Sequence, residues 1–453
     1  MTGLQRIWES AAYGAAPIAD CWWAETTETG DWPALQGDAR ADVAVIGAGF
    51  TGLNAALHLA EAGLGVTVLE ARHPFWGASG RNGGFCCLGG AKAGFADMAR
   101  RFGEGEARAW AATERAAVDH VAALIDRLGL EVDRHSEGET QLAHRPCDYA
   151  ALCASVDHIR DVYGAEPILI PPEDLARAGL NGPFHGALTT PIGFALNPRK
   201  YAAGLARAAS RAGAMIHGES AVTGIEPLAQ GGYRLRTAHG TVTAGRLVLA
   251  TNGYSSDNLP PWMASRYLPT QSSVIVTRPM TDDELAAQGW TSAQMCYDTR
   301  HLLHYVRLMP DNRMLFGMRG GLRQTPRSES GIRRAIRRDF EHMFPAWRDV
   351  ETPWYWSGFV CLTRDLLPYA GPIPDMPGAF AGFAWHGNGV AMGSYAGTLL
   401  ADLARGRVPA RPCPAPLRHP PRRFPLGRFR RLLMRPAYLR YMLKDRQGHF
   451  GER

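Results

Sequence analysis

The residues best suited to chemistry lie in three glycine-rich segments, spread from the N-terminal to the C-terminal part of the sequence. The first has the pattern G-x-G-x-x-G, and the residues that we expect to contact a ligand are Gly47, Gly49, Phe50, Thr51 and Gly52. It follows an apolar run over 42–47 and opens a predicted helix over 52–62. Free N–H groups and the positive end of the helix dipole attract phosphates, so this segment predicts a dinucleotide site.

An acidic residue completes this first motif. Glu70 ends the next apolar run, over 66–70, and lies 18 residues after Gly52. A carboxylate at this place can accept hydrogen bonds from both ribose hydroxyls. Gly47 permits a tight turn, while Gly49 lets the backbone approach a pyrophosphate. These residues predict a βαβ unit for NAD or FAD, and the spacing alone does not choose between the two cofactors.

The second glycine-rich segment favours FAD. It follows the strand that ends at Glu70, and the residues expected to contact the cofactor are Ala78, Ser79, Arg81, Asn82, Gly83 and Gly84. An open chain of this kind can wrap an extended cofactor, and Asn82 can face a flavin ring. The sequence has no second G-x-G-x-x-G for a nicotinamide cofactor. A plain NAD-dependent dehydrogenase is the alternative.

The third segment lies near the C-terminus and precedes a predicted helix over 394–403. The residues expected at the cofactor are Gly387, Asn388, Gly389 and Val390. Bare N–H groups at a helix start stabilise a nearby anion, and in a flavoenzyme the useful anion is the reduced flavin ring. We therefore expect this segment at the pyrimidine edge of the flavin.

The elements between these segments must bring them together. The apolar patterns predict helices over 104–128 and 198–212, strands over 221–226, 233–238 and 246–250, and a mostly β region over 271–317 with a hairpin turn at Asp311-Asn312. A chain of 453 residues with 46% hydrophobic and 20% charged residues is typical of a globular protein of two domains. No apolar run reaches 18 residues, no secretion signal is recognised, and the eight cysteines lack C-x-x-C spacing. We expect a reduced cytoplasmic protein without a metal site.

The charge is concentrated at the C-terminus. Residues 411–453 contain eleven Arg and one Lys against two acidic residues, a net charge of +10. This pattern predicts a solvated basic tail over an acidic body. A peripheral contact with an anionic membrane is an alternative, because apolar residues interleave with the arginines: Phe424, Phe429, Leu432, Leu433 and Tyr438. Nucleic acid is not expected as a partner, since no binding motif accompanies the charge.

Together the motifs resemble the D-amino acid oxidase superfamily of FAD-dependent oxidoreductases, and within it the γ-glutamylputrescine oxidase-like branch. The similar segments include CWWAET from Cys21, the GASGRNGG loop, WSG from Trp356 and YMLKD from Tyr441. The resemblance implies an α/β fold, with a discontinuous Rossmann-type FAD-binding domain over 38–100, 195–262 and 355–405. It also implies an α+β substrate domain over 101–194 and 263–354, built on a mainly antiparallel sheet. An N-terminal arm over 1–37 and a basic tail over 406–453 complete the chain.

The resemblance also implies an activity. A hydride would pass from the α-carbon of an amine to flavin N5, and water would hydrolyse the imine. A γ-glutamylputrescine-like or other amine is the expected substrate. A D-amino acid or glycine-type dehydrogenase or oxidase is one alternative, and a flavin-binding docking protein without turnover is another. The residues implied near the adenine and beneath the cofactor are Val222, Thr251 and Gly253, and the aromatic residues suited to wall an amine pocket are Tyr305, Trp354, Trp356 and Trp385.

One position bears on how the flavin and the substrate are held. By the resemblance, the place of Val360 holds a flavin-linking cysteine in sarcosine oxidases and a carboxylate-binding arginine in glycine oxidase-like enzymes. A valine can do neither, and Cys361 would face the other side of a strand. We therefore expect non-covalent FAD and a different anchor for any carboxylate, with Arg307, Arg323 and Arg364 as candidates.

The electron acceptor is the remaining question. Sarcosine oxidase-like enzymes place a lysine over the flavin to help O₂ accept electrons. This sequence has three lysines, at 92, 200 and 444, and none lies around 305–317, where the resemblance would put that residue. Arg307 is the expected substitute. The expected acceptor is O₂, helped by Arg307, or a quinone or partner protein.

Overall fold

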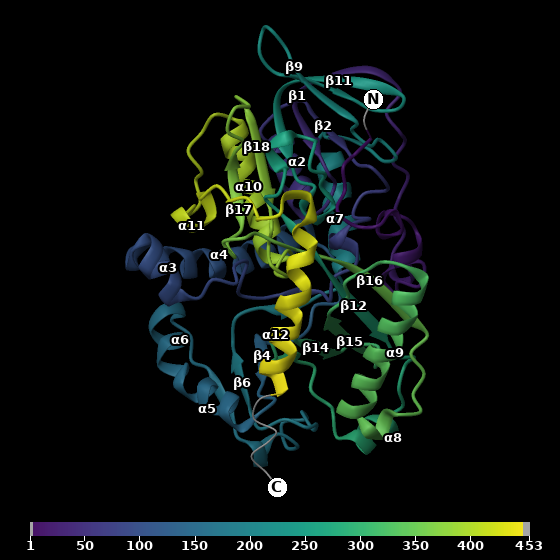
Figure 1. The fold of residues 1–453 in the computed structure, drawn as a ribbon, viewed down its shortest axis with the longest axis vertical. Coiled ribbons are helices and arrows are strands. Elements are labelled where there is room, and N and C mark those ends of the chain that lie inside the picture. Colours follow the sequence, from purple (N-terminus) through teal and green to yellow (C-terminus); the bar gives the residue numbers. More distant parts are fainter. Residues whose placement is uncertain (1–2, 447–453) are drawn as a thin grey trace.

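The computed structural model describes residues 3–446 and is built around two large mixed sheets (Figure 1). The first sheet has the order β17-β18-β11-β1-β2-β8, and β10 and β9 extend it from β11. Its strands are β1 (Gly37–Ile46), β2 (Val66–Leu69), β8 (Met215–His217), β9 (Gly224–Pro227), β10 (Tyr233–Arg236), β11 (Gly240–Leu249), β17 (Tyr369–Pro372) and β18 (Ala379–Phe383). The pairs that join β18, β11, β1, β2 and β8 are all parallel. This is the predicted Rossmann-type arrangement.

Helices cover the first sheet closely. They are α2 (Phe50–Glu61), α4 (Glu104–Leu128), α7 (Pro198–Arg211) and α10 (Ala391–Ala404). Most of the side chains of α2 and α10 are buried, because each helix packs between the sheet and further helices. A Cβ at Gly397 would lie 2.5 Å from the Thr51 carbonyl oxygen. The glycine therefore allows α10, near the end of the chain, to lie against the first turn of α2.

The second sheet has the order β16-β12-β15-β14-β13-β4-β6-β5. Its strands are β4 (Glu139–Leu142), β5 (Ile168–Ile170), β6 (Ala187–Thr190), β12 (Leu268–Val276), β13 (Met295–Asp298), β14 (His304–Leu308), β15 (Met314–Arg319) and β16 (Trp354–Leu362). Only the pair β13–β4 is parallel, so the predicted mainly antiparallel sheet is confirmed. A separate aromatic core lies against it, together with α8 (Asp282–Gln288) and α9 (Pro326–Met343).

The remaining elements are short. They are α1 (Trp23–Thr26), α3 (Phe95–Phe102), α5 (Pro146–Ala154), α6 (Val156–Tyr163), α11 (Ala415–Arg418), α12 (Met434–Arg446), β3 (Phe85–Cys86), β7 (Phe194–Ala195), and the 3₁₀ turns η1 (Ser10–Tyr13), η2 (Ala16–Ile18), η3 (Ala78–Gly80), η4 (Pro172–Asp174), η5 (Asn252–Tyr254), η6 (Pro261–Met263), η7 (Pro345–Trp347) and η8 (Gly427–Leu433). All eight cysteines are free. In the part of the chain that the structure describes, no helix is long and apolar enough to cross a membrane.

Several predicted elements differ in extent from the observed ones. The helix over 104–128 is confirmed at both ends, and β14 and β15 flank the predicted turn at Asp311-Asn312. By contrast, β1 begins at Gly37, five residues before the predicted strand. It pairs there with β11, whose first residue is Gly240 and not Arg246. The leading halves of both strands are partly exposed and carry polar residues, so the apolar pattern revealed only their buried ends.

One predicted domain boundary is wrong. We expected residues 355–405 in the FAD-binding domain, yet residues 355–362 belong to β16, which pairs with β12 along its length in the second sheet. Long-range pairing of this kind is not visible in the local sequence. The other domain boundaries stay a prediction.

The basic C-terminal segment packs onto the body. In Figure 1 the yellow helix α12 crosses the molecule from the region of the first sheet toward that of the second. Arg430 is fully buried and donates to both carboxylate oxygens of Asp257, at 2.7 and 2.8 Å. Asp445 accepts hydrogen bonds from the backbone N–H groups of His301 and Leu302. The segment is thus fixed in place as far as residue 446, and residues 447–453 lie outside the described part.

Candidate active site

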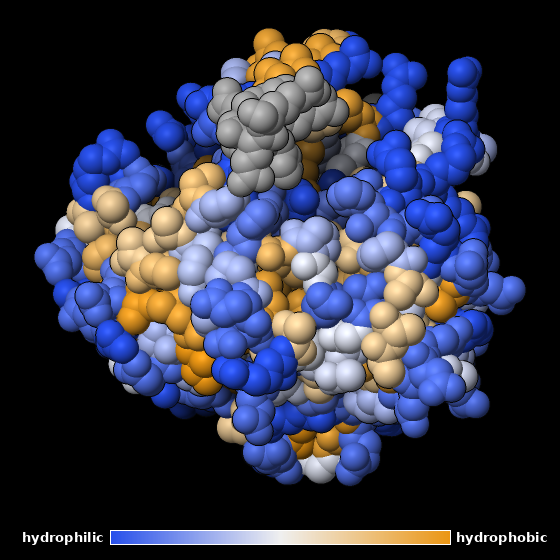
Figure 2. Space-filling model, turned by 90° about the horizontal axis from the view of Figure 1, so that it is seen from below, coloured by the Kyte–Doolittle hydropathy of each residue, from blue (hydrophilic) through white to orange (hydrophobic). Residues whose placement is uncertain are grey.

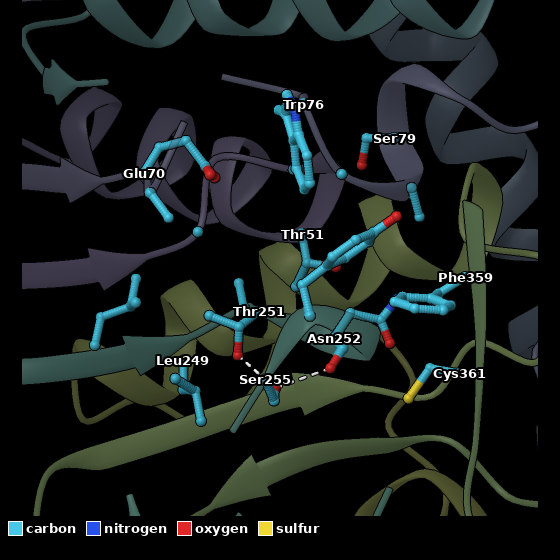
Figure 3. Close-up of a pocket in the computed structure, with 18 of the residues that line it drawn as sticks. Thr51, Glu70, Trp76, Ser79, Leu249, Thr251, Asn252, Ser255, Phe359 and Cys361 are labelled. Carbon is cyan, nitrogen blue, oxygen red and sulfur yellow. Dashed lines mark hydrogen bonds between the residues drawn. The ribbon is translucent and has the colours of Figure 1, made fainter. Parts of the chain in front are cut away.

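The larger cavity, of about 520 Å³, opens at the carboxyl ends of β1, β2 and β11 (Figure 3). Ligands of open α/β sheets bind at this edge, where chain connections leave in opposite directions. The cavity is lined by parts of all three glycine-rich segments and by residues of the N-terminal arm. We call it the cofactor cavity.

The first two glycine-rich segments are joined at this cavity. Ser79 Oγ accepts a hydrogen bond from the Phe50 N–H at 2.9 Å, and a Cβ at Gly49 would lie 2.8 Å from the same oxygen. Gly47 has φ of +101°, which a side chain would disfavour. A Cβ at Gly52 would lie 1.9 Å from the Gly47 carbonyl oxygen. The glycines therefore permit a tight turn that presents the start of α2 to the cavity.

Glu70 directly follows β2 and borders the cavity. Its two carboxylate oxygens accept the N–H groups of Ala48, at 2.8 Å, and Arg72, at 3.1 Å. Burial raises the pKa of this carboxyl. Each oxygen keeps a further lone pair, so the fixed carboxylate can accept both hydroxyls of a ribose.

The arm and η5 contribute polar groups that the protein itself leaves unsatisfied. Arg6 Nε, Tyr13 Oη and Tyr254 Oη are buried, and none has a hydrogen-bond partner among the described residues. All three residues line the cofactor cavity. A buried polar atom without a partner costs about 1–3 kcal/mol. A polar ligand such as FAD, with its phosphates and hydroxyls, can satisfy them, so these residues fit the cofactor.

The third glycine-rich segment closes the inner end of the cavity. Trp385, Gly387, Gly389 and Val390 line it. His386 ties this segment to two others: its Nδ1 donates to the Gly90 carbonyl at 2.9 Å, and its Nε2 accepts from the Thr363 N–H at 3.3 Å. Burial lowers the pKa of His386 to about 3, so the ring is neutral and its tautomer is fixed by these two partners.

A second cavity, of about 270 Å³, adjoins the first. The two share the lining residues Ala78, Asn82, Phe359, Val360 and Gly387. Tyr305 of β14 borders it, with its ring held beside Gly83 and Gly317, where a Cβ would lie 2.9 and 2.1 Å from the ring. Tyr305 Oη is 3.0 Å from Ser272 Oγ. We call this space the substrate cavity, because it meets the end of the cofactor cavity that is expected to hold the flavin.

Charged side chains from distant parts of the sequence meet in the substrate cavity. Lys92 and Arg319 supply positive charge and Glu139 supplies a carboxyl group. Lys92 is accessible to water within the cavity while protein atoms surround it, and this partial desolvation lowers the pKa of its ammonium to about 8. Burial raises the pKa of Glu139 to about 7 and lowers that of Arg319. Arg319 Nη2 donates to the His386 carbonyl at 3.3 Å, while its buried Nε has no partner within residues 3–446.

The structure brings most of the predicted site residues to these two cavities. The cofactor cavity is lined by Gly47, Gly49, Phe50, Thr51, Glu70, Ala78, Ser79, Asn82, Val222, Thr251, Trp385, Gly387, Gly389 and Val390. The substrate cavity is lined by Ala78, Arg81, Asn82, Gly83, Tyr305, Gly387 and Asn388. Gly52, Gly84 and Gly253 lie outside both linings, and each makes room for backbone or side chains packed behind the cavities.

Two predicted catalytic residues lie elsewhere. Arg307 donates to the Leu196 carbonyl at 2.9 Å and stacks over the ring of Trp23, away from both cavities. Trp356 is buried behind the second glycine-rich loop and donates to the Arg81 carbonyl. The expectation failed because Trp23, from the arm, occupies the space beside these residues. Their observed contacts support the second glycine-rich loop.

The cations of the substrate cavity were missed. We expected Arg307 to be the cation nearest the reaction centre, but Lys92 and Arg319 line the cavity. The candidates Arg323 and Arg364 are exposed and line neither cavity. The one signal was the position of Lys92 at the end of the second glycine-rich segment, in a sequence with only three lysines.

Val360 lines both cavities, as its place in the motif implied, and Cys361 also borders the cofactor cavity (Figure 3). Burial raises the pKa of the Cys361 thiol to about 12. The nucleophilic thiolate is therefore scarce at neutral pH. This favours the predicted non-covalent flavin.

The fold and these cavities define a flavin-dependent oxidoreductase, and the family comparison agrees. Residues 42–403 match the family model described as FAD dependent oxidoreductase, and the chain belongs to this family. The predicted FAD cofactor is confirmed at the level of the family, and the alternative of a plain NAD-dependent dehydrogenase is wrong.

Two relatives and two solved structures show similarity over most of the chain. Gamma-glutamylputrescine oxidoreductase of Escherichia coli K12 is 31% identical, over 90% of this chain and 93% of its own. A probable oxidoreductase OrdL of Rhizobium meliloti is also 31% identical, over 94% and 97%. Glycine oxidase from Geobacillus kaustophilus has a TM-score of 0.69 at 22% identity, over 84% and 98%. L-proline dehydrogenase from P. horikoshii has a TM-score of 0.66 at 20% identity, over 83% and 95%. These two structures support the fold.

Proposed function

We propose that this enzyme oxidises a C–N bond of an amine that also carries a carboxylate, such as a γ-glutamylputrescine-like compound. The observation that supports the proposal is the pair of cations, Lys92 and Arg319, in the cavity that adjoins the flavin end of the cofactor cavity. A guanidinium binds a carboxylate in a bidentate manner, and an ammonium adds a point charge. The names of the relatives point to amines and amino acids in the same way.

The residues of the substrate cavity have distinct roles in this proposal. Bound FAD supplies the acceptor for the hydride that leaves the substrate's α-carbon. Arg319 and Lys92 hold the carboxylate and so fix the substrate's orientation. Glu139 in its ionised form takes the proton from the substrate's ammonium group, which leaves the nitrogen lone pair free to assist hydride loss. The ring of Tyr305 forms an apolar wall, and water hydrolyses the resulting imine.

Two other functions follow from different readings of the same cavity. A D-amino acid or glycine-type oxidation would place the carboxylate next to the reacting carbon, which the paired cations also permit. A flavin-binding docking protein would show no turnover. Substrate length separates the first alternative from our proposal, since a longer amine places its carboxylate farther from the flavin.

The test is an anaerobic titration of the purified yellow holoenzyme with a panel of substrates. The panel pairs γ-glutamylated and free diamines with glycine, D-alanine and sarcosine. We expect the oxidised-flavin absorption band to bleach with long carboxylate-bearing amines. Faster bleaching by glycine or D-alanine than by these amines would contradict the proposed substrate class. No bleaching by any member of a broad amine panel would favour the docking protein.

For the electron acceptor we propose O₂, or else a quinone or partner protein. Lys92 is the candidate to assist O₂ because it lines the substrate cavity, while Arg307 lines neither cavity. A nearby positive charge stabilises negative charge that develops on the acceptor. Stopped-flow mixing of the reduced enzyme with oxygenated buffer tests this, with Lys92→Met compared with Arg307→Met. Slower reoxidation in Arg307→Met alone would restore the prediction made from the sequence.

A further inference from the structure

The surface of the C-terminal segment differs from the rest of the molecule in its exposed apolar side chains. Eleven large hydrophobic side chains are exposed among the described residues, and six of them lie within 426–443, a small fraction of the chain. These six are between 44% and 56% exposed: Leu426, Phe429, Leu432, Leu439, Met442 and Leu443. In Figure 2 hydrophobic residues lie at the upper edge of the view. This edge corresponds to the front of Figure 1, where α12 is drawn. Exposed apolar residues that gather in one patch mark an interaction site.

The spacing of the six residues follows the local helix type. Phe429 and Leu432 are three residues apart along η8, a 3₁₀ helix with three residues per turn, and Leu426 directly precedes this helix. Leu439, Met442 and Leu443 have i, i+3, i+4 spacing along α12. Phe429 and Leu432 therefore form a row along one side of η8, and the three α12 residues form a row along one side of α12. The α12 row leaves the opposite side of the helix, with the half-buried Tyr438 and Tyr441, for contacts with the body.

Positive charge flanks both rows. Arg428, Arg435 and Arg440 are exposed, and within residues 3–446 none of them forms an ion pair. The nearby acidic residue, Asp445, is occupied by the backbone of His301 and Leu302. The outward face thus combines apolar side chains with unpaired cations.

The segment is rigidly attached, so these side chains are presented by a fixed support. Arg430 is buried against Asp257, and Arg431 pairs with Glu9 at 3.0 Å and donates to the Leu322 carbonyl at 2.7 Å. Arg430 and Arg431 therefore attach η8 to the body of the protein, while Arg428, Arg435 and Arg440 are exposed. A segment selected only for solubility would have no reason to expose its large apolar residues on this side.

We propose that residues 426–444 bind the surface of an anionic lipid bilayer. Apolar side chains can enter the boundary between headgroups and acyl chains, while the arginines contact anionic headgroups. A second copy of this chain is a poorer occupant, since a two-fold contact would place the arginines of one copy against those of the other. Nucleic acid accounts for the charge and leaves the apolar rows unexplained.

The experiment is co-sedimentation of the full-length holoenzyme with vesicles of phosphatidylcholine alone or mixed with phosphatidylserine. We expect binding to the mixed vesicles that weakens as salt is added, and little binding to the neutral ones. The charge variant R428Q/R435Q/R440Q should bind about 100-fold more weakly, from roughly a factor of five for each basic residue. The apolar variant L439S/M442S/L443S should lose at least tenfold.

Matched controls keep these results interpretable. The variant I168S/L169S alters two exposed apolar residues on β5, far along the chain, and should bind as the unaltered protein does. Flavin content and thermal unfolding should be unchanged in every variant, because the altered side chains are exposed. The proposal is wrong if the protein ignores both kinds of vesicle, or if the apolar variant binds normally. It is also wrong if the apolar rows instead hold a dimer, which the apolar variant would dissociate in sedimentation velocity.

Discussion

The cofactor cavity and the substrate cavity adjoin each other but are built in different ways. The cofactor cavity is made largely from backbone: three short glycine-rich segments turn tightly and present N–H groups. The substrate cavity is made from side chains that meet from β4, β13, β14 and β15 and from the loop that carries Lys92. One cavity is thus specified by local sequence patterns and the other by tertiary contacts between residues far apart in the chain.

The difference has consequences for specificity. Backbone groups cannot be exchanged by substitution, so a site built from them keeps the same ligand while the rest of the sequence changes. Ionisable side chains can be replaced one at a time, and each replacement alters charge, size and proton affinity. We therefore expect substitutions in the first cavity to affect flavin retention and substitutions in the second to affect substrate choice. Five predictions test this separation.

The largest effect is expected from Gly52→Ala. The new Cβ would lie 1.9 Å from the Gly47 carbonyl oxygen, within a backbone contact that cannot yield without opening the turn. We expect no flavin in the purified protein and a clear drop in its melting temperature. Gly105→Ala in α4 is the matched control, because nothing lies within 4 Å of its Cβ position and alanine favours a helix by about 0.5–1 kcal/mol. Normal flavin content in Gly52→Ala would contradict the packing argument.

A second prediction concerns the cations of the substrate cavity. Arg319→Met should keep its flavin and lose about 2–5 kcal/mol of binding for a carboxylate-bearing amine, seen as a rise in KM. Lys92→Met should act in the same direction by a smaller amount, since Lys92 is more accessible to water. Lys200→Met is the control, because that lysine lies on α7 and pairs with Asp133. If Arg319→Met instead releases the flavin, the two cavities are not separable.

Glu70→Ala probes the carboxylate that we expect to bind the ribose of the cofactor. Removing the carboxylate leaves the Ala48 and Arg72 N–H groups and the ribose without an acceptor. We expect FAD to bind more weakly by about 1–3 kcal/mol, measured as cofactor loss on dialysis and as the Kd on reconstitution. Glu70→Gln should recover part of the affinity. Equal flavin retention in Glu70→Ala and the unaltered protein would remove this residue from the site.

The pH dependence should separate the substrate cavity further. Because the pKa of Glu139 is raised to about 7, kcat/KM should fall as the pH is lowered through 7, and Glu139→Gln should lack this limb. The free energy of unfolding should change in the opposite direction with pH. Between the pKa of Glu139 in the unfolded chain, near 4.5, and its pKa of about 7 in the native state, the native state binds a proton that the unfolded state has lost. Stability therefore declines as the pH rises through this window. Melting temperatures of the protein and of Glu139→Gln across pH 4 to 8 should differ in slope.

The smallest effect is expected from Cys361→Ala. Acid precipitation should release the flavin into the supernatant both before and after the substitution, because the buried thiol, with its pKa raised to about 12, stays protonated. Colour that remains in the pellet of the unaltered protein, and is lost in Cys361→Ala, would show a covalent link.

The contrast between the cavities also explains what the sequence predicted. The G-x-G-x-x-G turn, Glu70 and the loop over 77–84 are local patterns with a fixed backbone geometry, and most of their residues line one of the two cavities, as predicted. Lys92 and Arg319 belong to no local pattern; they meet only because β15 and the loop before α3 are brought together by the fold. Arg307 was misjudged for the same reason, since Trp23 reaches it from almost 300 residues away.

The N-terminal arm has a consequence for how the enzyme is made. Leu4, Arg6 and Tyr13 wall the cofactor cavity, and Val390 completes its other end. In addition, β1 cannot complete its strand pairing before β11 has been synthesised, because Gly37 of β1 pairs with Gly240 of β11. A nascent chain on the ribosome therefore has no finished binding site for FAD until α10 has been synthesised. Cofactor capture must come late in translation or after it, and a chain cut short before Val390 should not be rescued by added FAD.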